Sequence, residues 1–277
     1  MTAQTSHPAA PPSGAPSAAT PWDLSQDARM PLSRLVSVEI RKSFDTRAGR
    51  WLTISIIGLV LVASVIGAFA FPEGQQDYVN LLGLAGGILG YFLPILMILL
   101  ITSEWTQRTG LVTFALEPRR PRVVLAKVLA GLALAVVVLA LGAAIAAGAT
   151  ALSPVNGGEA VWNLGGTEVQ NFLLTSVIGV LVGFALAMLL RNSAAAIVAY
   201  FVYTFILPIV ADALSALVDG FEKIAPWVEF NTAQMPLFTG DYRATGEEWA
   251  QIAVSGTIWL VIPFAFGVWR LMRAEVK

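Results

Sequence analysis

The residues that could do chemistry are few, and they exclude most enzyme classes. The sequence has no cysteine and one histidine, His7, near its start. Zinc catalysis, haem ligation by histidine and Ser-His-Asp chemistry therefore have no residues in the apolar part of the chain. Asp212 stands alone in an apolar stretch and cannot form an acid–base dyad. Because the P-loop pattern G-x-x-x-x-G-K-[ST] is also missing, we expect no enzyme, no bound cofactor and no metal site.

The most informative polar segment covers residues 101–127. It reads ITSEWTQRTG, then LVTFAL, then EPRRPRVVLAK. Glu104 and Arg108 are four residues apart, so a helix would place them on one face as an ion pair. The turn at 111–116 is apolar enough to contact another protein. A simple basic loop with capping prolines explains the arginines, but it does not explain the Glu104–Arg108–Thr109 group or the apolar turn.

Long apolar stretches flank this segment and fill most of the chain after residue 50. A bilayer core needs about 20 apolar residues in a helix, which satisfies every backbone hydrogen bond by itself. Strands of a β-barrel would alternate in polarity, and these stretches do not. We therefore predict an all-α polytopic membrane protein with six transmembrane helices. The predicted spans are 51–71, 81–103, 123–152, 172–190, 194–217 and 249–269.

Charge placement orients the six spans. Of the 17 lysines and arginines, all but Lys223 and Arg243 fall on the side of the two termini. Basic loops stay cytoplasmic, so both termini are predicted to be cytoplasmic. We expect a multi-pass protein of a bacterial plasma membrane. The formal net charge of −1 conceals this asymmetry, which reflects membrane topology and gives no reason to expect a nucleic-acid partner.

The segments outside the spans differ in character. Residues 1–28 are rich in Ala, Pro, Ser and Thr and are predicted to form a disordered cytoplasmic tail. Residues 29–50 should contain an amphipathic helix that lies in the membrane interface, because apolar and basic residues occupy opposite faces. This helix is either a topology anchor or an elbow that carries force from a cytoplasmic partner into the first span. Residues 218–248 are broken by prolines and suit a re-entrant or interfacial hairpin.

Polar residues inside the spans are candidates for a substrate path. They are Asn171, Thr175, Tyr200, Tyr203 and Asp212. The two tyrosines share a helix face, but packing within the bundle explains them equally well. Asp212 lies near a span end, where it could simply reach water. Gly179 and Gly183 have small-xxx-small spacing, which indicates close helix packing inside one bundle or, alternatively, dimerisation.

Several of these features together resemble the permeases of ABC-2 type transporters. That pattern has a glutamate ending the second span, here Glu104, followed by the Arg-Thr pair at Thr109 and a basic stretch that ends at Lys127. The run from Glu39 to Arg47 before the first span is similar to the elbow helix of the family. Pro208, late in the fifth span and followed by a broken outer segment, is also similar. The resemblance covers nearly the whole chain from about residue 31.

The resemblance implies the transmembrane subunit of an ATP-driven transporter, with export of an amphipathic or lipophilic compound as the expected direction. Two copies of a separate ATP-binding subunit would bind ATP and Mg, and a second permease, identical or paralogous, would complete the assembly in the membrane lipid. The elbow helix would use Glu39, Arg41, Lys42 and Arg47. Coupling to the ATP-binding subunit would use Glu104, Arg108, Thr109, Phe114, Glu117, Arg119, Arg120 and Arg122.

Two other functions remain open on the sequence alone. A secondary transporter or channel usually places several ionisable groups in mid-membrane, and here only Asp212 comes close. A membrane scaffold that recruits a cytoplasmic complex would use the segment at 101–127 equally well. Stimulation of ATP hydrolysis by a lipophilic compound would separate a transporter from a scaffold.

Overall fold

The computed structural model describes residues 30–72, 74–106, 119–238 and 242–273, and all regular structure in these ranges is helical. It confirms the predicted all-α chain with six helices long and apolar enough to cross a membrane. These are Arg47–Ala70, Tyr78–Trp105, Arg120–Val155, Gly166–Leu190, Ser193–Leu217 and Gly246–Arg273. Each begins one to six residues before the predicted apolar stretch, because polar residues form the first turns. The predicted tail at 1–28 lies outside the described residues.

Helices from Leu32 onward form one compact unit. They are α1 (Leu32–Asp45), α2 (Arg47–Ala70), α3 (Tyr78–Thr106), α5 (Arg120–Leu152), α6 (Gly166–Leu190), α7 (Ser193–Phe201), α8 (Leu207–Leu217), α9 (Phe221–Val228), α10 (Phe230–Gln234), α11 (Gly246–Gly256) and α12 (Ile262–Arg273). One π-helical turn, Val202–Ile206, joins α7 to α8, and another, Thr257–Val261, joins α11 to α12.

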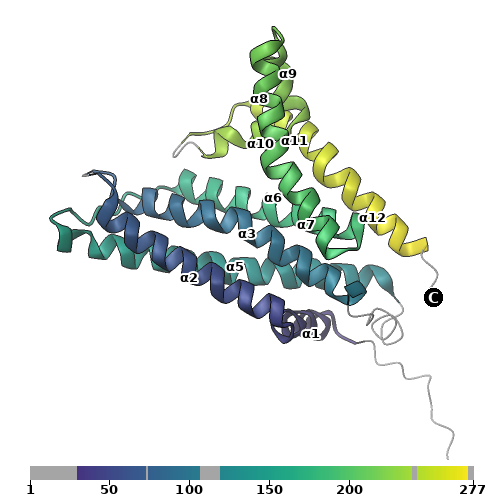
Figure 1. The fold of residues 1–277 in the computed structure, drawn as a ribbon. Coiled ribbons are helices and arrows are strands. Elements are labelled where there is room, and N and C mark those ends of the chain that lie inside the picture. Colours follow the sequence, from purple (N-terminus) through teal and green to yellow (C-terminus); the bar gives the residue numbers. More distant parts are fainter. Residues whose placement is uncertain (1–29, 73, 107–118, 239–241, 274–277) are drawn as a thin grey trace, which may run out of the picture. The chain divides into compact units, whose positions relative to one another are not determined.

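Helix α3 is central to this unit. It contacts α2, α5, α6 and α7, and α2, α3, α5 and α6 lie side by side (Figure 1). In the most apolar window, 56% of the residues of α3 and of α6 are buried, against 22% in the fifth and sixth spans. Helix α12 packs along α6, whereas α8 and α11 contact α9 instead. The fifth and sixth spans therefore leave the largest share of their apolar windows uncovered by the rest of the described chain.

The predicted helical segment 29–50 is two helices instead of one. Helix α1 ends at Asp45, and Thr46 caps the start of α2 by accepting a hydrogen bond from the backbone of Gly49 at 3.1 Å. A Cβ at Gly49 would meet the carbonyl of Ser43, so glycine permits the close approach of the two helices. Helix α1 then packs against α5 and α2. The break thus turns α1 back onto the bundle.

The segment after the fifth span forms two short helices, α9 and α10, that pack against α8 and α11. Each is tied to one π-helical turn. Asn231 donates to the carbonyl of Tyr203 at 3.0 Å, and the indole of Trp259 donates to the carbonyl of Val228 at 2.7 Å. The rings of Tyr203 and Trp259 also pack, with centroids 5.7 Å apart. Whether this unit re-enters the membrane stays a prediction.

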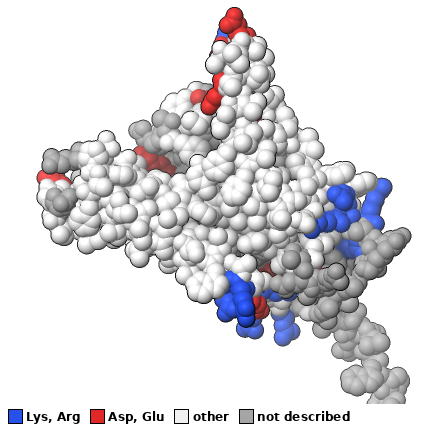
Figure 2. All heavy atoms as spheres, viewed as in Figure 1, with Lys and Arg blue, Asp and Glu red and all other residues white. Residues whose placement is uncertain are grey.

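Charge separates along the molecule. Lysines and arginines gather at the end formed by α1, the start of α5 and the end of α12, whereas most carboxylates lie toward α9 and the opposite ends of the spans (Figure 2). Two buried carboxylates break this rule, because Glu39 and Glu104 lie at the basic end. Their surroundings form the candidate site.

Candidate functional site

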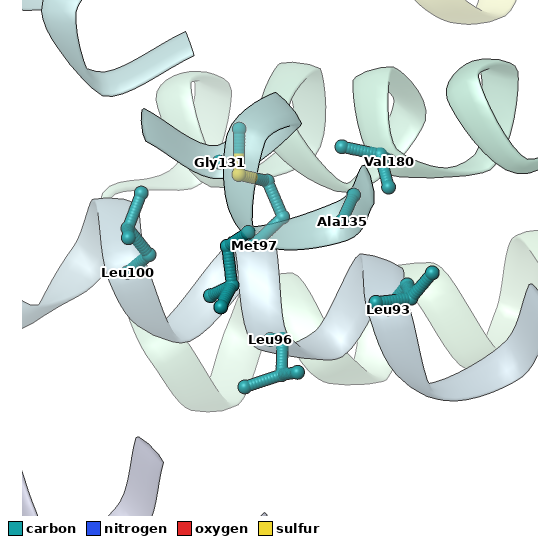
Figure 3. A pocket seen from close by; sticks show the side chains of 8 residues that line it. Leu93, Leu96, Met97, Leu100, Gly131, Ala135 and Val180 are labelled. Carbon is teal, nitrogen blue, oxygen red and sulfur yellow. The ribbon is translucent and has the colours of Figure 1, made fainter. Parts of the chain in front are cut away.

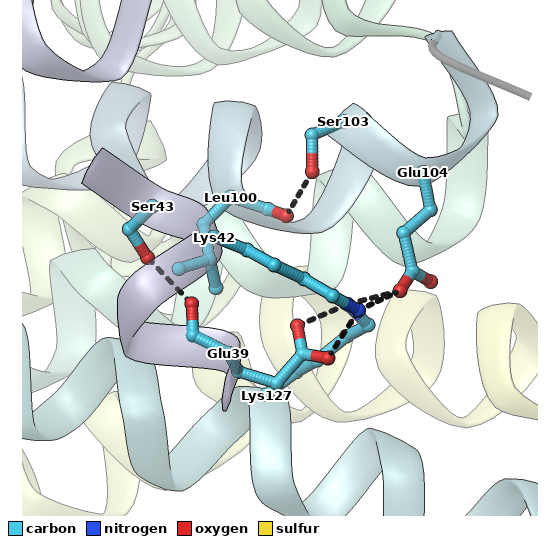
Figure 4. Close-up of polar contacts among 7 residues, drawn as sticks. All are labelled: Glu39, Lys42, Ser43, Leu100, Ser103, Glu104 and Lys127. Carbon is cyan, nitrogen blue, oxygen red and sulfur yellow. Dashed lines mark hydrogen bonds and ion pairs between the residues drawn. The ribbon is translucent and has the colours of Figure 1, made fainter. Parts of the chain in front are cut away.

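Four ionisable side chains from three helices form a closed ring of ion pairs at the basic end. Lys42 Nζ lies 2.9 Å from Glu39 Oε1 and 3.0 Å from Glu104 Oε1. Lys127 Nζ lies 2.6 Å from Glu39 Oε2 and 3.1 Å from Glu104 Oε1. Each lysine thus contacts both glutamates (Figure 4). We call these four residues the ion ring.

The ion ring is assembled by three elements. Glu39 and Lys42 are one turn apart on α1, Glu104 lies in the last turn of α3, and Lys127 lies in the second turn of α5. Pro121 lies in the first turn of α5, where the backbone needs no N–H donor. The ring therefore connects the helix before the first span to both helices that flank the segment 107–118.

Burial makes this ring costly to open. Glu39 is 5% exposed, and Glu104 and Lys127 are each 3% exposed. An isolated charge at such a depth would be strongly destabilising, whereas two cations and two anions in contact neutralise one another. Separating α1 from α3 or α5 would leave buried charges without partners. The three helix ends are therefore expected to move together.

Lys42 is the one member of the ion ring that reaches the surface, with 37% of its side chain exposed. Partial burial by itself lowers the pKa of Lys42. The hydrogen bonds and charges of Glu39 and Glu104 outweigh burial, so the pKa lies above the usual 10.5. Lys42 is therefore charged at any physiological pH.

The predicted coupling residues divide into two groups. Arg108, Thr109, Phe114 and Glu117 lie outside the described residues, and so does the predicted Glu104–Arg108 pair. Within the described residues, Glu104 pairs with Lys42 and Lys127. Arg119 precedes α5 at the surface, and Arg120 donates to the carbonyl of Leu271 on α12.

The elbow residues divide as well. Glu39 and Lys42 face inward into the ion ring, whereas Arg41 and Arg47 are exposed. Arg122 lies in the first turn of α5, where its backbone N–H donates to the carbonyl of Arg119. Sequence reasoning placed Lys127 only at the end of the basic stretch and gave it no role. The available signal was a lysine inside an apolar helix, which needs an anionic partner.

The five candidate path residues do not share one location. Asn171 is buried and donates to the carbonyl of Tyr242 at 3.0 Å, and Thr175 donates to the carbonyl of Asn171 in its own helix. Tyr200 and Tyr203 are buried together, 6.4 Å apart by ring centroids. Asp212 is exposed on α8. The contacts of Asn171, Thr175 and the two tyrosines hold the helices together. The five residues therefore form no common polar lining among the described helices.

Two small cavities lie between the helices, and Lys42 of the ion ring lines one of them. One is apolar, has a volume of about 10 Å³ and is lined mainly by α3 and α5, including Leu96, Met97 and Gly131 (Figure 3). The other, also about 10 Å³, is lined by Lys42, Thr46 and neighbouring residues of α3 and α5. A volume of this size holds about one water molecule. Neither cavity can hold a cargo molecule in this conformation.

The chain was compared with family models and with curated proteins. No family model matches the chain, and no curated protein matches it. The resemblance to ABC-2 permeases therefore rests on the residues that carry it.

Proposed function

We propose that this chain is the transmembrane permease subunit of an ABC-2 type transporter that exports an amphipathic or lipophilic compound. The observation that carries the proposal is the ion ring, which joins the helix before the first span to the helices on both sides of the segment 107–118. A permease needs such a connection, because a movement at its cytoplasmic face must reach the spans.

The ion ring explains how force would be transmitted. A separate ATP-binding subunit would dock at the segment 107–118 and pull on the ends of α3 and α5. Glu104 and Lys127 lie on these ends, and both contact α1 through Glu39 and Lys42. Because opening the ring would expose buried charge to a low dielectric, α1 would follow the movement as a rigid extension.

Charge distribution supports the orientation that this mechanism requires. Basic side chains gather at the end of the molecule that holds the ion ring (Figure 2), and basic ends of membrane proteins face the cytoplasm. Two ATP-binding subunits, carrying ATP and Mg, would bind at this end. A second permease would complete the central path, and the exposed apolar faces of the fifth and sixth spans offer surface for it. A plasma-membrane location follows from the same proposal.

The first experiment is a pull-down from detergent-solubilised membranes with this chain as bait and its genomic neighbours co-expressed. We expect a P-loop ATPase in stoichiometric amount, with ATP hydrolysis stimulated by lipophilic compounds. Recovery of a stable chain without an ATPase would contradict the proposal and favour a channel, a secondary transporter or a scaffold.

A variant pair then tests the coupling role of the ion ring. Glu104→Gln removes one buried charge of the ion ring. It should therefore reduce the ATP hydrolysis stimulated by lipophilic compounds at least several-fold, while the ATPase subunit stays bound. Glu159→Gln is the matched control, because Glu159 is exposed and far from the ring in sequence. Arg108→Ala should also uncouple hydrolysis from transport. Unchanged transport in both the Glu104 and the Arg108 variants would remove the coupling role.

A further inference from the structure

Three arginines from three parts of the chain meet where α6 ends. Arg191 directly follows α6, Arg270 lies in the last turns of α12, and Arg120 is the first residue of α5. Arg270 donates to the carbonyl of Leu189 at 3.2 Å, and Arg120 donates to the carbonyl of Leu271. These two bonds hold the end of α12 between α6 and α5. The three cationic side chains are thereby brought into one region.

Arg191 lacks hydrogen-bond partners for most of its guanidinium. Its Nε and Nη2 atoms are buried and have no acceptor among the described residues. The guanidinium lies 5.9 Å from the ring centroid of Trp105, which supplies only the face of an aromatic ring. Burial, followed by the charges of Arg270 and Arg120, lowers the pKa of Arg191, but a guanidinium stays charged. No carboxylate among the described residues accepts from these two atoms, so an anionic acceptor would complete their hydrogen bonding.

The backbone at Arg191 is also unusual for an arginine. Arg191 has φ 52°, and it is the only non-glycine residue with positive φ in the described part of the chain. Glycine or asparagine is the usual residue at this position after a helix. An arginine here accepts backbone strain, yet no residue in the described ranges partners its Nε and Nη2 atoms.

Apolar and aromatic side chains adjoin the basic region. Phe266, Trp269 and Met272 on α12 are all exposed, and the first two rings stack at 5.4 Å. The guanidinium of Arg273 lies 4.5 Å from the ring centroid of Trp269. Tryptophan and arginine at a span end mark the headgroup level of a bilayer. A ligand with both an anionic group and acyl chains fits this combination better than a soluble anion.

We propose that Arg191 and Arg270 bind the phosphate of an anionic phospholipid, with Arg120 adding positive charge and the acyl chains lying along Phe266 and Trp269. Guanidinium groups match phosphate by paired, charge-assisted hydrogen bonds. The edge formed by Nε and Nη2 is one of the two paired-donor edges of a guanidinium, and a turn of the Arg191 side chain would present both atoms to a phosphate. The site lies in the leaflet at the basic end of the molecule.

Native mass spectrometry of the chain in uncharged detergent tests this site. The probes are phosphatidylglycerol and phosphatidylcholine at equal concentration, with inorganic phosphate in a third sample. We expect preferential retention of phosphatidylglycerol by the unmodified chain. Arg191→Asn, which suits positive φ, and Arg270→Gln should each weaken this retention about tenfold, the loss of one charge-assisted contact. Arg50→Gln, at an exposed arginine in the first turn of α2, is the control and should retain the lipid fully.

Each outcome decides the proposal. Equal retention of the two lipids, or equal loss in the Arg50 control, would overturn it, since binding would then be unspecific. Retention of inorganic phosphate in place of the lipid, lost in Arg191→Asn, would overturn the lipid as the source of the phosphate. Monodisperse elution of both variants in size-exclusion chromatography shows that they fold, and a lipid preference unchanged in both would contradict the site.

Discussion

Lys127 Nζ lies 2.6 Å from Glu39 Oε2, although 88 residues separate them in the chain. Both side chains are almost fully buried, and neither could be accommodated alone in an apolar bundle. Because Glu39 belongs to α1 and Lys127 to α5, this contact fixes the helix before the first span against the third span. The pair therefore sets the position of α1, whether or not the chain transports anything.

Replacing the lysine should destabilise the fold strongly. In Lys127→Met, the carboxylates of Glu39 and Glu104 share a single cation, and breaking a buried pair costs about 3–5 kcal/mol. We expect a loss of this order in the free energy of unfolding, measured by denaturant titration in micelles. Lys223→Met, at an exposed lysine on α9, should change the free energy of unfolding little.

A second substitution separates charge from packing in the same measurement. Lys127→Met combined with Glu39→Gln restores one cation to one anion, so the double variant should lose less stability than the sum of the two single variants. Strictly additive losses would show that the four charges act independently and that the ring is not a unit.

The contribution of Lys42 should depend on pH at the alkaline end. Its pKa is raised in the folded chain, so its stabilising effect is complete below 10.5 and is lost as pH rises through the folded value. The difference in melting temperature between the unmodified chain and Lys42→Met should therefore stay constant from neutral pH to about pH 10 and shrink above it. A difference that shrinks already at lower pH would contradict the pairing of Lys42 with Glu39 and Glu104.

Sequence patterns predicted the six spans well, because an apolar run of this length has one stable arrangement in lipid. They also identified Glu39, Lys42 and Glu104 as notable residues, but in two separate groups. Ion pairs 62 and 88 residues apart cannot be derived from spacing along one helix. The short-range rule proposed Arg108 as the partner of Glu104, whereas the two lysines reach Glu104 only because α1 and α3 both pack against α5.

Spacing along the sequence also could not decide the role of the candidate substrate-path residues. Polar residues in an apolar run indicate function or internal pairing, and spacing does not distinguish the two. For Asn171 and Tyr200 the structure gives a hydrogen-bond partner in another part of the chain. Thr46 is a typical helix-capping residue and could have indicated the break, but the prediction treated residues 29–50 as one amphipathic helix.

Helix α6 should tolerate the replacement of Gly179 by alanine but not the replacement of Gly183. A Cβ at Gly183 would lie 2.5 Å from the carbonyl oxygen of Pro94 and 2.8 Å from its Cα, whereas a Cβ at Gly179 would be 3.5 Å from the nearest atom. Gly183→Ala should therefore force α3 and α6 apart and lower the free energy of unfolding by about 1–3 kcal/mol. Gly179→Ala should be neutral or slightly stabilising, through helix propensity.

The comparison of Gly183→Ala with Gly179→Ala also distinguishes the two interpretations of the small-xxx-small spacing, packing within one bundle and dimerisation. The contact of Gly183 with Pro94 confirms packing within one chain. If Gly179→Ala instead reduced oligomer formation in cross-linking while Gly183→Ala had no effect on stability, the glycine face would serve a second chain, and the intramolecular packing would be the lesser role.

Tyr200 completes a hydrogen bond that Pro94 removes from α3. Proline has no N–H, so the carbonyl of Gly90, four residues earlier, has no donor from its own helix. The hydroxyl of Tyr200 donates to this carbonyl at 3.1 Å. Tyr200→Phe should leave the carbonyl without a partner in an apolar setting and cost about 1–3 kcal/mol of unfolding free energy.

A double-mutant cycle tests this explanation against the substrate-path alternative. In a Pro94→Ala background the new N–H can bond to Gly90, so Tyr200→Phe should cost well under half as much as in the unmodified chain. Tyr91→Phe, at an exposed tyrosine one residue after Gly90, is the matched control and should cost little in either background. Tyr200→Phe could instead leave stability unchanged and alter the stimulation of ATP hydrolysis by lipophilic compounds. That result would show that the hydroxyl acts on cargo, because the loss of a purely structural hydrogen bond would first weaken the fold.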